Sequence, residues 1–411
     1  MTRQSLLLLT AVAALQCLGC SPATEPRSLQ PELLTVPAGD KSTSPRISSS
    51  QSGEVVLSWL QPDAEGLSLH YARLVDGHWG ERHTVVTGAT MFVNWADLPS
   101  VVPLGDGQMA AHWLDKKPYS TYSYDVIYSQ SHDDGVTWSA PMSPHSDGTP
   151  TEHGFVSMFR SSDKTGVIWL DGRKTVNEVL DDPTSSGMTL RATFLDKEQN
   201  LHGDQLVDEL ICDCCPTDVA IAASGPIAVY RDRSPDEIRD IYVTRHIDGK
   251  WQEGKRVGVD NWEIAGCPVN GPSIAATGDS VAIAWFTAAR SRPVVRLAVS
   301  SDSGNSFADP QDITSDATLG RVGVVMLDDG AVAVSWLQTG ENGKSEVRAR
   351  KINADGKRGP ERIVSFSASS FAVPQMARAG DKLIFAWSEV RDGSGHIASA
   401  SIAVGALTRV N

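Results

Sequence analysis

The sequence Val55-Val56-Leu57-Ser58-Trp59 is a short apolar run that ends in an aromatic residue, and six similar runs follow it along the chain. Successive aromatic ends lie 51 to 61 residues apart, and they are Trp59, Trp113, Trp169, Tyr230, Trp285, Trp336 and Trp387. A repeat of this order, made of short β segments, is typical of a β-propeller in which each repeat forms one blade. The sequence therefore predicts an all-β, seven-bladed β-propeller.

The second repeat shows how one blade is expected to form. Its inner strand is predicted at residues 100–104, the second strand at 108–113, the third at 125–130 and a short fourth strand after Trp138. Helical periodicity is absent over long stretches, so we expect very little helix. The last repeat has room for only three strands, and an unpaired sheet edge is a liability. We therefore expect residues 32–36 to supply the missing outer strand.

The N-terminus has the pattern of an export signal. Arg3 gives a positive start, residues 6–15 form an apolar core, and Cys17-Leu18-Gly19-Cys20 follows as a processing site. This pattern resembles a bacterial lipoprotein signal with lipid attached to Cys20, and an ordinary cleaved signal peptide is the alternative. Residues 1–19 are thus predicted as signal peptide, 20–38 as a Pro-rich tether and 39–411 as the propeller. Ser21 favours the outer membrane, with the protein facing the periplasm or the cell surface.

The formal net charge of −14 bears on the partners of the chain. Such a surface repels nucleic acid and anionic lipid headgroups, so we expect no nucleic-acid partner and membrane contact only through the lipid anchor. A local basic pocket can still bind an anionic ligand.

Two segments match the pattern Ser-x-Asp-x-Gly-x-Thr/Ser-aromatic. Their motif residues are Ser131, Asp133, Gly135 and Trp138 in the second repeat, and Ser300, Asp302, Gly304 and Phe307 in the fifth. The pattern predicts a tight hairpin turn, because the Asp carboxylate can accept backbone N–H bonds and Gly tolerates positive φ. The role of these residues is therefore expected to be structural.

These segments resemble the Asp-boxes, or BNR repeats, of the sialidase (neuraminidase) superfamily, and the resemblance covers most of the mature chain. It implies that the boxes lie on the face opposite the active site. Because most members have six blades, a six-bladed sialidase-type propeller is the alternative fold. If the chain is an enzyme, the resemblance implies a glycoside hydrolase of exo-α-sialidase type, although another glycoside-cleaving or lyase chemistry is also open. No cofactor is implied.

The loops that lead into the inner strands, and those between second and third strands, are expected on the face away from the Asp-boxes. They carry many arginines, which suit carboxylate, sulfate or phosphate groups. By resemblance, sialidases need three arginines, an acidic acid/base and a Tyr–Glu nucleophile pair. The candidates are Arg46, Arg231 or Arg233, and Arg290 or Arg321 as arginines, Asp63 or Asp97 as the acid, and Glu237 nearby. No Tyr follows Tyr242, where the family has its nucleophile. The alternative is that Arg and Asp residues pair with one another to hold the loops.

Besides the lipidated Cys20, four cysteines remain after processing: Cys212, Cys214, Cys215 and Cys267. They lie in equivalent loops of adjacent repeats, so we expect them to meet. In an oxidising compartment, two disulfides are predicted, with three pairings open. The alternatives are a thiolate site for copper or zinc, with His153 as a further ligand, and labile thiol exchange.

Taken together, the sequence indicates an exported propeller that binds glycans or other anionic ligands at an Arg-rich central face, with or without cleaving them. A non-catalytic envelope scaffold that docks a protein and a thiolate metal-binding protein are the alternatives.

Overall fold

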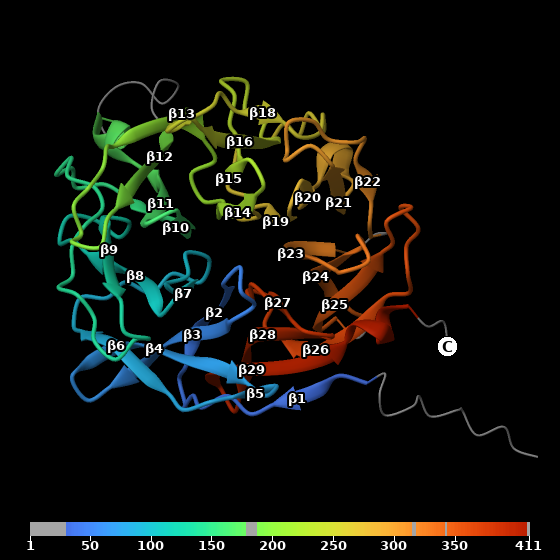
Figure 1. The fold of residues 1–411 in the computed structure, drawn as a ribbon, viewed down its shortest axis with the longest axis horizontal. Coiled ribbons are helices and arrows are strands. Elements are labelled where there is room, and N and C mark those ends of the chain that lie inside the picture. The colour runs from blue at the N-terminus through green and yellow to red at the C-terminus, as the bar shows by residue number, and fades with distance from the viewer. Residues whose placement is uncertain (1–29, 178–186, 315–317, 342, 409–411) are drawn as a thin grey trace, which may run out of the picture.

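The computed structural model describes residues 30–177, 187–314, 318–341 and 343–408. Within these ranges the chain is all-β, and seven antiparallel sheets surround a central axis as the blades of a propeller (Figure 1). Helical structure in the described ranges consists of three short 3-10 segments, η2 (Arg173–Asn177), η3 (Ala289–Ser291) and η4 (Val404–Leu407). The predicted seven-bladed propeller and the near absence of helix are confirmed, and the six-bladed alternative is wrong.

The first three blades follow the chain order. Blade one contains β2 (Thr43–Ser49), β3 (Val55–Asp63), β4 (Gly66–Val75), β5 (His78–Trp79) and β6 (His83–Gly88). Blade two contains β7 (Ser100–Gly105), β8 (Gln108–Lys116) and β9 (Tyr124–Ser131). Blade three contains β10 (His153–Ser161), β11 (Lys164–Asp171), β12 (Met188–Leu195) and β13 (Gln205–Ile211).

The remaining four blades continue round the ring. Blade four contains β14 (Asp218–Ala222), β15 (Gly225–Arg231), β16 (Ile241–Ile247), β17 (Lys250–Trp251) and β18 (Lys255–Arg256). Blade five contains β19 (Ser273–Thr277), β20 (Ser280–Thr287), β21 (Val294–Ser300) and β22 (Gln311–Asp312). Blade six contains β23 (Thr318–Met326), β24 (Val332–Thr339), β25 (Ser345–Ile352) and β26 (Arg362–Ala368). Blade seven contains β27 (Gln375–Ala379), β28 (Lys382–Arg391) and β29 (Ser394–Ala403).

The ring is closed by β1 (Glu32–Leu34), which pairs antiparallel with β29 through Leu33 and Ala400 (Figure 1). The expectation that the N-terminal segment completes the last blade is confirmed. The boundary at residue 38 needs correction, because residues 32–34 are part of the propeller rather than of the tether. Cys20 and the predicted signal peptide lie outside the described residues.

Blade two departs from the predicted four strands. Its sheet has three strands, and the chain after Trp138 contributes a single bridge between Met142 and Tyr128. The correction has a simple cause: this segment contains Pro141 and Pro144, which cannot donate N–H groups to a ladder.

The recurring aromatic residues form the core between blades. Trp59 belongs to a buried cluster shared by blades seven and one, and Trp113 to one shared by blades one and two. The other five follow the same rule around the ring, each packing against the preceding blade. All seven aromatics are buried, with Trp113 the most exposed at 5%. Burying side chains of this size stabilises each junction, which explains why the repeat is visible in the sequence.

Both Ser-x-Asp-x-Gly turns form as predicted. Asp133 Oδ1 accepts the N–H of Thr137 at 2.9 Å, and Gly135 has φ 81°. The N–H of Asp134 donates to Gly107 O at 2.9 Å, in the turn between β7 and β8. The motif therefore lies at the end of the propeller where first and second strands are joined, and the loops leading into the inner strands lie at the other end.

No described helix is long and apolar enough to cross a membrane.

Candidate functional site

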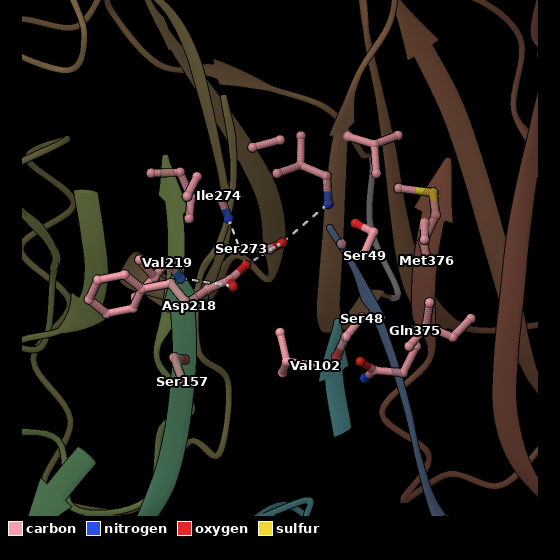
Figure 2. A pocket seen from close by; sticks show the side chains of 18 of the residues that line it. Ser48, Ser49, Val102, Ser157, Asp218, Val219, Ser273, Ile274, Gln375 and Met376 are labelled. Atoms are coloured by element: carbon pink, nitrogen blue, oxygen red, sulfur yellow. Dashed lines mark hydrogen bonds between the residues drawn. The ribbon is translucent and has the colours of Figure 1, made fainter. Parts of the chain in front are cut away.

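The inner strands of all seven blades surround a central channel with a volume of about 770 Å³ (Figure 2). We call the end nearest the loops that lead into the inner strands the mouth. Residues of the mouth that line the channel include Arg46, Asp218, Asn270 and Arg321. Every blade contributes residues to the channel, so a ligand bound there can contact many loops at once.

One layer of the channel can be defined from strand register. In each blade, one inner-strand residue pairs with the residue just before the recurring aromatic, as Arg46 does with Ser58. The seven residues of this layer, all of which line the channel, are Arg46, Ser100, Ser157, Asp218, Ser273, Gly323 and Gln375. The layer is thus polar and contains one cation, Arg46, and one anion, Asp218.

Hydrogen bonds connect this layer from blade to blade. Asp218 Oδ2 accepts the N–H of Ile274 at 3.0 Å and the hydroxyl of Ser273 at 3.1 Å (Figure 2). Ser273 Oγ in turn accepts the N–H of Val324 at 3.3 Å. Burial raises the pKa of Asp218, with the charge of Arg46 and these donors opposing the rise. Asp218 therefore stabilises the wall of the channel, because its carboxylate already accepts hydrogen bonds from the neighbouring blade.

Arg46 is positioned by a bulge near the start of β2, where the register shifts between Thr43 and Arg46 and Ser44 adopts φ 56°. Among the described residues, no hydrogen bond or ion pair of its guanidinium is present. Burial lowers the pKa of His112 to about 3, and the positive charge of Arg46 contributes to this lowering. Arg46 is thus a channel-lining cation with donors available.

Arg321 occupies the equivalent bulge of blade six and has φ 55°. Its guanidinium lies 4.9 Å from the ring centroid of Trp95, and one terminal nitrogen donates to Val269 O. The buried Nε has no partner, and burial lowers the pKa of Arg321 to about 10. Trp95 also contacts Phe371 edge-on, with centroids 5.6 Å apart. Trp95 lies in the segment between blades one and two. At the mouth its ring therefore contacts Arg321 of blade six and Phe371, which precedes blade seven.

Arg231 has a different place. It is 1% exposed, and its Nε, Nη1 and Nη2 donate to the carbonyl oxygens of Asn270, Arg239 and Phe286 at 3.0, 2.6 and 2.6 Å. It does not line the channel. The expectation that Arg231 faces a ligand carboxylate is corrected, because its donors hold three backbone segments together.

Arg233 and Glu237 are brought together, but as an ion-pair network. Glu237 Oε1 accepts from Arg233 at 2.6 Å, and its Oε2 accepts from Arg239 at 2.8 Å. Arg233 also lies 3.2 Å from Asp213. For these residues the alternative in which Arg and acidic side chains hold the loops describes the structure better than a ligand site.

Asp97 is buried before β7, where its Oδ1 accepts the N–H of Phe155 at 2.8 Å. Asn270, three residues before the layer in blade five as Asp97 is in blade two, accepts the N–H of Arg321 at 2.8 Å. Phe155 and Arg321 both have positive φ. Asp97 and Asn270 therefore fix the same inner-strand bulge in the next blade, which is a structural role.

Asp97 also belongs to an acidic cluster. The hydroxyl of Tyr124 lies 3.1 Å from Asp97 Oδ2 and 2.5 Å from Glu152 Oε1. Burial raises the pKa of both Asp97 and Glu152 to about 7. These three residues do not line the channel.

The last two candidates are surface residues. Asp63 is the exposed last residue of β3, where it accepts from Ala64 N–H and Ser68 Oγ at 2.5 and 3.2 Å. Arg290 is exposed in η3. Neither lines the channel.

The four cysteines form two disulfides, Cys212–Cys215 and Cys214–Cys267, with Cα separations of 5.7 and 6.1 Å. The prediction of two disulfides is confirmed, and the second joins the loops before blades four and five. The thiolate metal site does not fit, because all four sulfurs are in disulfides. His153 lies apart from them, in a cluster with Asp147 and Asp171. Thiol exchange stays a prediction.

The sequence matches no protein-family model and no curated protein. Among solved structures, a protein of unknown function from Dyadobacter fermentans is similar, with 14% identity, a TM-score of 0.51 and coverage of 91% of this chain and 98% of that one. The polysaccharide lyase Uly1 is similar at 11% identity and a TM-score of 0.50, covering 93% and 94%. The NanB sialidase of Streptococcus pneumoniae is 10% identical with a TM-score of 0.47, covering 92% and 71%.

Because the sequence identities are only 10–14%, these structural similarities support the propeller fold and nothing more specific. Sialidases and other glycan-active propellers are among the structural neighbours, and membership of the sialidase superfamily stays a prediction.

Sequence reasoning did not single out His145 and Asp147, which the structure brings against His153. The available signal was their spacing: two potential ligands two residues apart, within ten residues of a third, in one loop before an inner strand.

Proposed function

We propose that the chain is an exported, lipid-anchored propeller of the bacterial envelope that binds a carboxylate-bearing ligand, foremost an acidic glycan, at the mouth of its channel. The observation that carries the proposal is that Arg46 and Arg321 line the channel without an acidic partner in the described residues. The lipid attachment at Cys20 and the outer-membrane location rest on the sequence pattern alone.

The chemistry of the mouth suits a sugar acid. A guanidinium with open donors binds carboxylates as a fork, and partial burial strengthens that interaction. The ring of Trp95, 40% exposed, offers a flat apolar face beside Arg321. Asp218 stands in the same layer as Arg46, so a ligand with one carboxylate and several hydroxyls suits the channel better than a polyanion.

The geometry favours binding over sialidase-type hydrolysis. Tyr124 is a tyrosine paired with a carboxylate near the mouth, but it is fully buried, and burial raises its pKa well above the usual value. A nucleophile needs access to the substrate and a lowered pKa. A lyase or a hydrolase with another arrangement of catalytic residues is the alternative. Because Arg46 and Arg321 suit a carboxylate, uronate-containing glycans are the first ligands to test.

The test is calorimetric titration of the full chain in detergent with a uronate-containing oligosaccharide, with sialyllactose, and with their neutral counterparts. We expect binding of at least one acidic glycan, and Arg46→Gln and Arg321→Gln each to weaken it by about 10–100-fold, since a charge-assisted hydrogen bond contributes about 1.5–3 kcal/mol. Arg290→Gln is the matched control, because it removes an exposed arginine outside the channel.

Equal affinity for acidic and neutral glycans, or unchanged affinity in the Arg46→Gln/Arg321→Gln double variant, would contradict the anion site. No glycan binding at all would favour the envelope scaffold that docks a protein at this face.

A further inference from the structure

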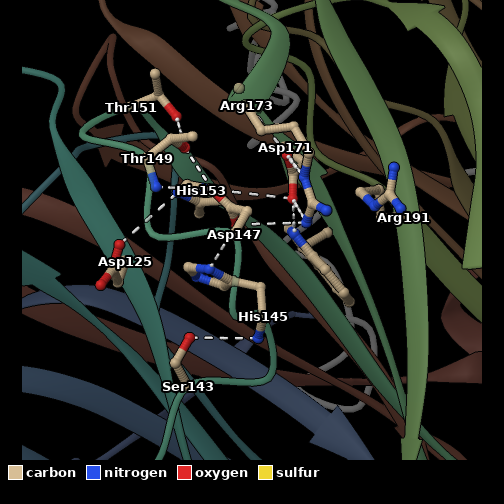
Figure 3. Close-up of polar contacts among 12 residues, drawn as sticks. Asp125, Ser143, His145, Asp147, Thr149, Thr151, His153, Asp171, Arg173 and Arg191 are labelled. Atoms are coloured by element: carbon tan, nitrogen blue, oxygen red, sulfur yellow. Dashed lines mark hydrogen bonds and ion pairs between the residues drawn. The ribbon is translucent and has the colours of Figure 1, made fainter. Parts of the chain in front are cut away.

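A second group of titratable side chains lies between blades two and three, outside the channel (Figure 3). His145 and Asp147 belong to the segment between β9 and β10, and His153 is the first residue of β10. Asp125 lies in β9, and Asp171 ends β11. The group is formed by strand ends and one loop on the mouth side of the propeller.

One ring nitrogen of each histidine lies close to the same carboxylate oxygen. Asp147 Oδ2 lies 3.1 Å from His153 Nε2 and 3.3 Å from His145 Nδ1. His153 is fully buried, His145 is 7% exposed, and the side chain of Asp147 is 8% exposed. Despite these distances, His153 Nε2 and Asp147 Oδ2 have no hydrogen-bond partner, and neither does the other nitrogen of each ring.

Buried polar atoms without partners are costly, so their concentration in one place points to a missing occupant. Two ligands about 2.1 Å from a shared metal ion lie about 3.0–3.4 Å apart at tetrahedral or octahedral angles. The two distances to Asp147 Oδ2 fall in this range. Two overlapping groups of side chains here have ligand atoms within 4.8 Å of one another: Asp147, His153 and Asp171, and Asp125, His145 and His153.

The charges single out Asp147 as the available carboxylate. Asp171 Oδ2 accepts from Arg173 at 2.6 Å and from Trp169 Nε1 at 2.8 Å. Asp125 is paired with Lys117. The Arg173 guanidinium also forms an ion-pair contact with Asp147 Oδ2, at 3.4 Å, and lies farther from it than the two histidine nitrogens.

The neighbours also hold the ligands in place. Asp147 Oδ1 accepts the N–H of Thr149 at 3.0 Å and contacts its hydroxyl, which leaves Oδ2 facing the histidines. Asp125 Oδ1 lies 3.8 Å from His153 Nδ1, on the side of the ring away from Asp147. A carboxylate behind a metal-bound imidazole is a common arrangement.

We propose that His145, Asp147 and His153 bind a divalent transition-metal cation of the Zn²⁺ class. Two imidazoles and one carboxylate suit Zn²⁺ and neighbouring first-row ions rather than Ca²⁺ or Mg²⁺, which prefer oxygen ligands. The site is separate from the disulfide-bonded cysteines and does not depend on the glycan proposal.

Metal binding requires one local change. The rings of His145 and His153 stack with centroids 3.9 Å apart and planes 9° apart. Parallel rings cannot both direct an in-plane lone pair at one point. His145, which lies on a loop rather than in a strand, therefore tilts out of the stack when the ion binds.

The experiment is titration of the full chain, freed of metal by chelation and kept without reductant, with Zn²⁺ and with Co²⁺. We expect one ion per chain by elemental analysis after dialysis, and a visible Co²⁺ spectrum that reports nitrogen and oxygen ligands. His145→Gln and Asp147→Asn are each expected to weaken Zn²⁺ binding by more than the about 10–100-fold that loss of an outer partner costs.

His202→Gln is the matched control, because His202 pairs with Asp196 at 2.8 Å on the surface and should leave Zn²⁺ affinity unchanged. Circular dichroism of each variant checks folding, and His145→Gln leaves every strand ladder intact. Absence of stoichiometric metal, or equal affinity in wild type and His145→Gln, overturns the proposal and indicates that a proton shared by the histidines and Asp147 occupies the site.

Discussion

Arg231 and Arg321 each place a guanidinium 4.9 Å from the centroid of a tryptophan ring, Trp262 for the first and Trp95 for the second. Burial lowers the pKa of both to about 10. They differ in their acceptors: all three nitrogens of Arg231 donate to carbonyl oxygens, whereas Nε of Arg321 is buried without a partner. The comparison teaches that burial and stacking alone do not show whether an arginine holds the fold together, whereas the number of its donors that have acceptors does.

Asn270 forms a hydrogen bond with each of these two arginines. Its carbonyl oxygen accepts from Arg231 Nε at 3.0 Å, and its side-chain oxygen accepts the N–H of Arg321 at 2.8 Å. Asp97 does the second of these tasks in blade two, with a carboxylate in place of the amide. Substitutions at these positions can therefore separate stability from ligand binding.

The largest effect is expected for Arg231→Met. Stability should fall by about 3–5 kcal/mol, because three buried carbonyl oxygens lose donors whose absence costs on the order of 1–3 kcal/mol each. Arg321→Met should cost only about 1 kcal/mol, because it removes a single such bond and also removes a buried Nε that has no partner. Urea unfolding of both variants measures the contrast. An equal decrease in the free energy of unfolding would mean that both arginines stabilise the fold to the same extent.

Asp97→Asn tests the acidic cluster through pH. Burial raises the pKa of Asp97 to about 7, against the opposing bonds from Phe155 and Tyr124, so the folded state binds a proton that the unfolded state releases near pH 4. Stability from this group is present below about pH 4 and is lost as pH rises toward about 7. Asn keeps an oxygen for Phe155 and does not titrate.

The stability of Asp97→Asn relative to wild type should therefore increase by on the order of 2–4 kcal/mol between pH 4 and pH 7.5. Urea unfolding at these two pH values measures it. A difference that does not change with pH would show that Asp97 stays ionised in the folded protein.

A smaller effect is expected for Asn270→Ala, which leaves the N–H of Arg321 without its acceptor at a strained position and should cost about 1–3 kcal/mol. Asn270→Asp keeps the acceptor oxygen and should cost less. Because the new carboxylate lies beside Arg321, it should also weaken anionic-glycan binding about tenfold, in line with roughly 1.4 kcal/mol of competing attraction. Unfolding and calorimetry together decide the result; unchanged affinity in Asn270→Asp would argue against Arg321 as a ligand contact.

The smallest effect on stability is expected for Trp95→Ala, about 0.5–1 kcal/mol, the contribution of a partly exposed cation–π contact. Trp262→Ala, at 7% exposure, should cost about 3–5 kcal/mol. Thermal unfolding compares the two. A loss in Trp95→Ala as large as in Trp262→Ala would place Trp95 in the core rather than at a binding surface.

Much of the fold could be predicted from local pattern. Trp59 and its six counterparts mark one inter-blade core each, and their recurrence alone indicates the number of blades. The closure by β1 followed from counting strands in the last repeat. The absent fourth strand of blade two could not be predicted from the repeat, because Pro141 and Pro144 interrupt pairing in that one copy.

The candidate site could be predicted only in part. Arg46 and Arg321 were among the candidates and line the channel, but Arg231, Arg233 and Glu237 looked equally suitable in the sequence. Their acceptors settle the difference, and those acceptors belong to other loops and blades. His145 and Asp147 were not selected, because nothing in a loop sequence says which side chains will converge.

The sequence by itself determined the architecture, the two hairpin turns around Asp133 and Asp302, and the meeting of four cysteines, because each depends on residues near one another or on a regular repeat. Tertiary structure alone decided which charged groups are satisfied. The three carbonyl oxygens that bind Arg231 come from residues 8, 39 and 55 positions away. Such partners are chosen by how blades pack, and the free energy of a buried charge depends on those partners rather than on its neighbours in sequence.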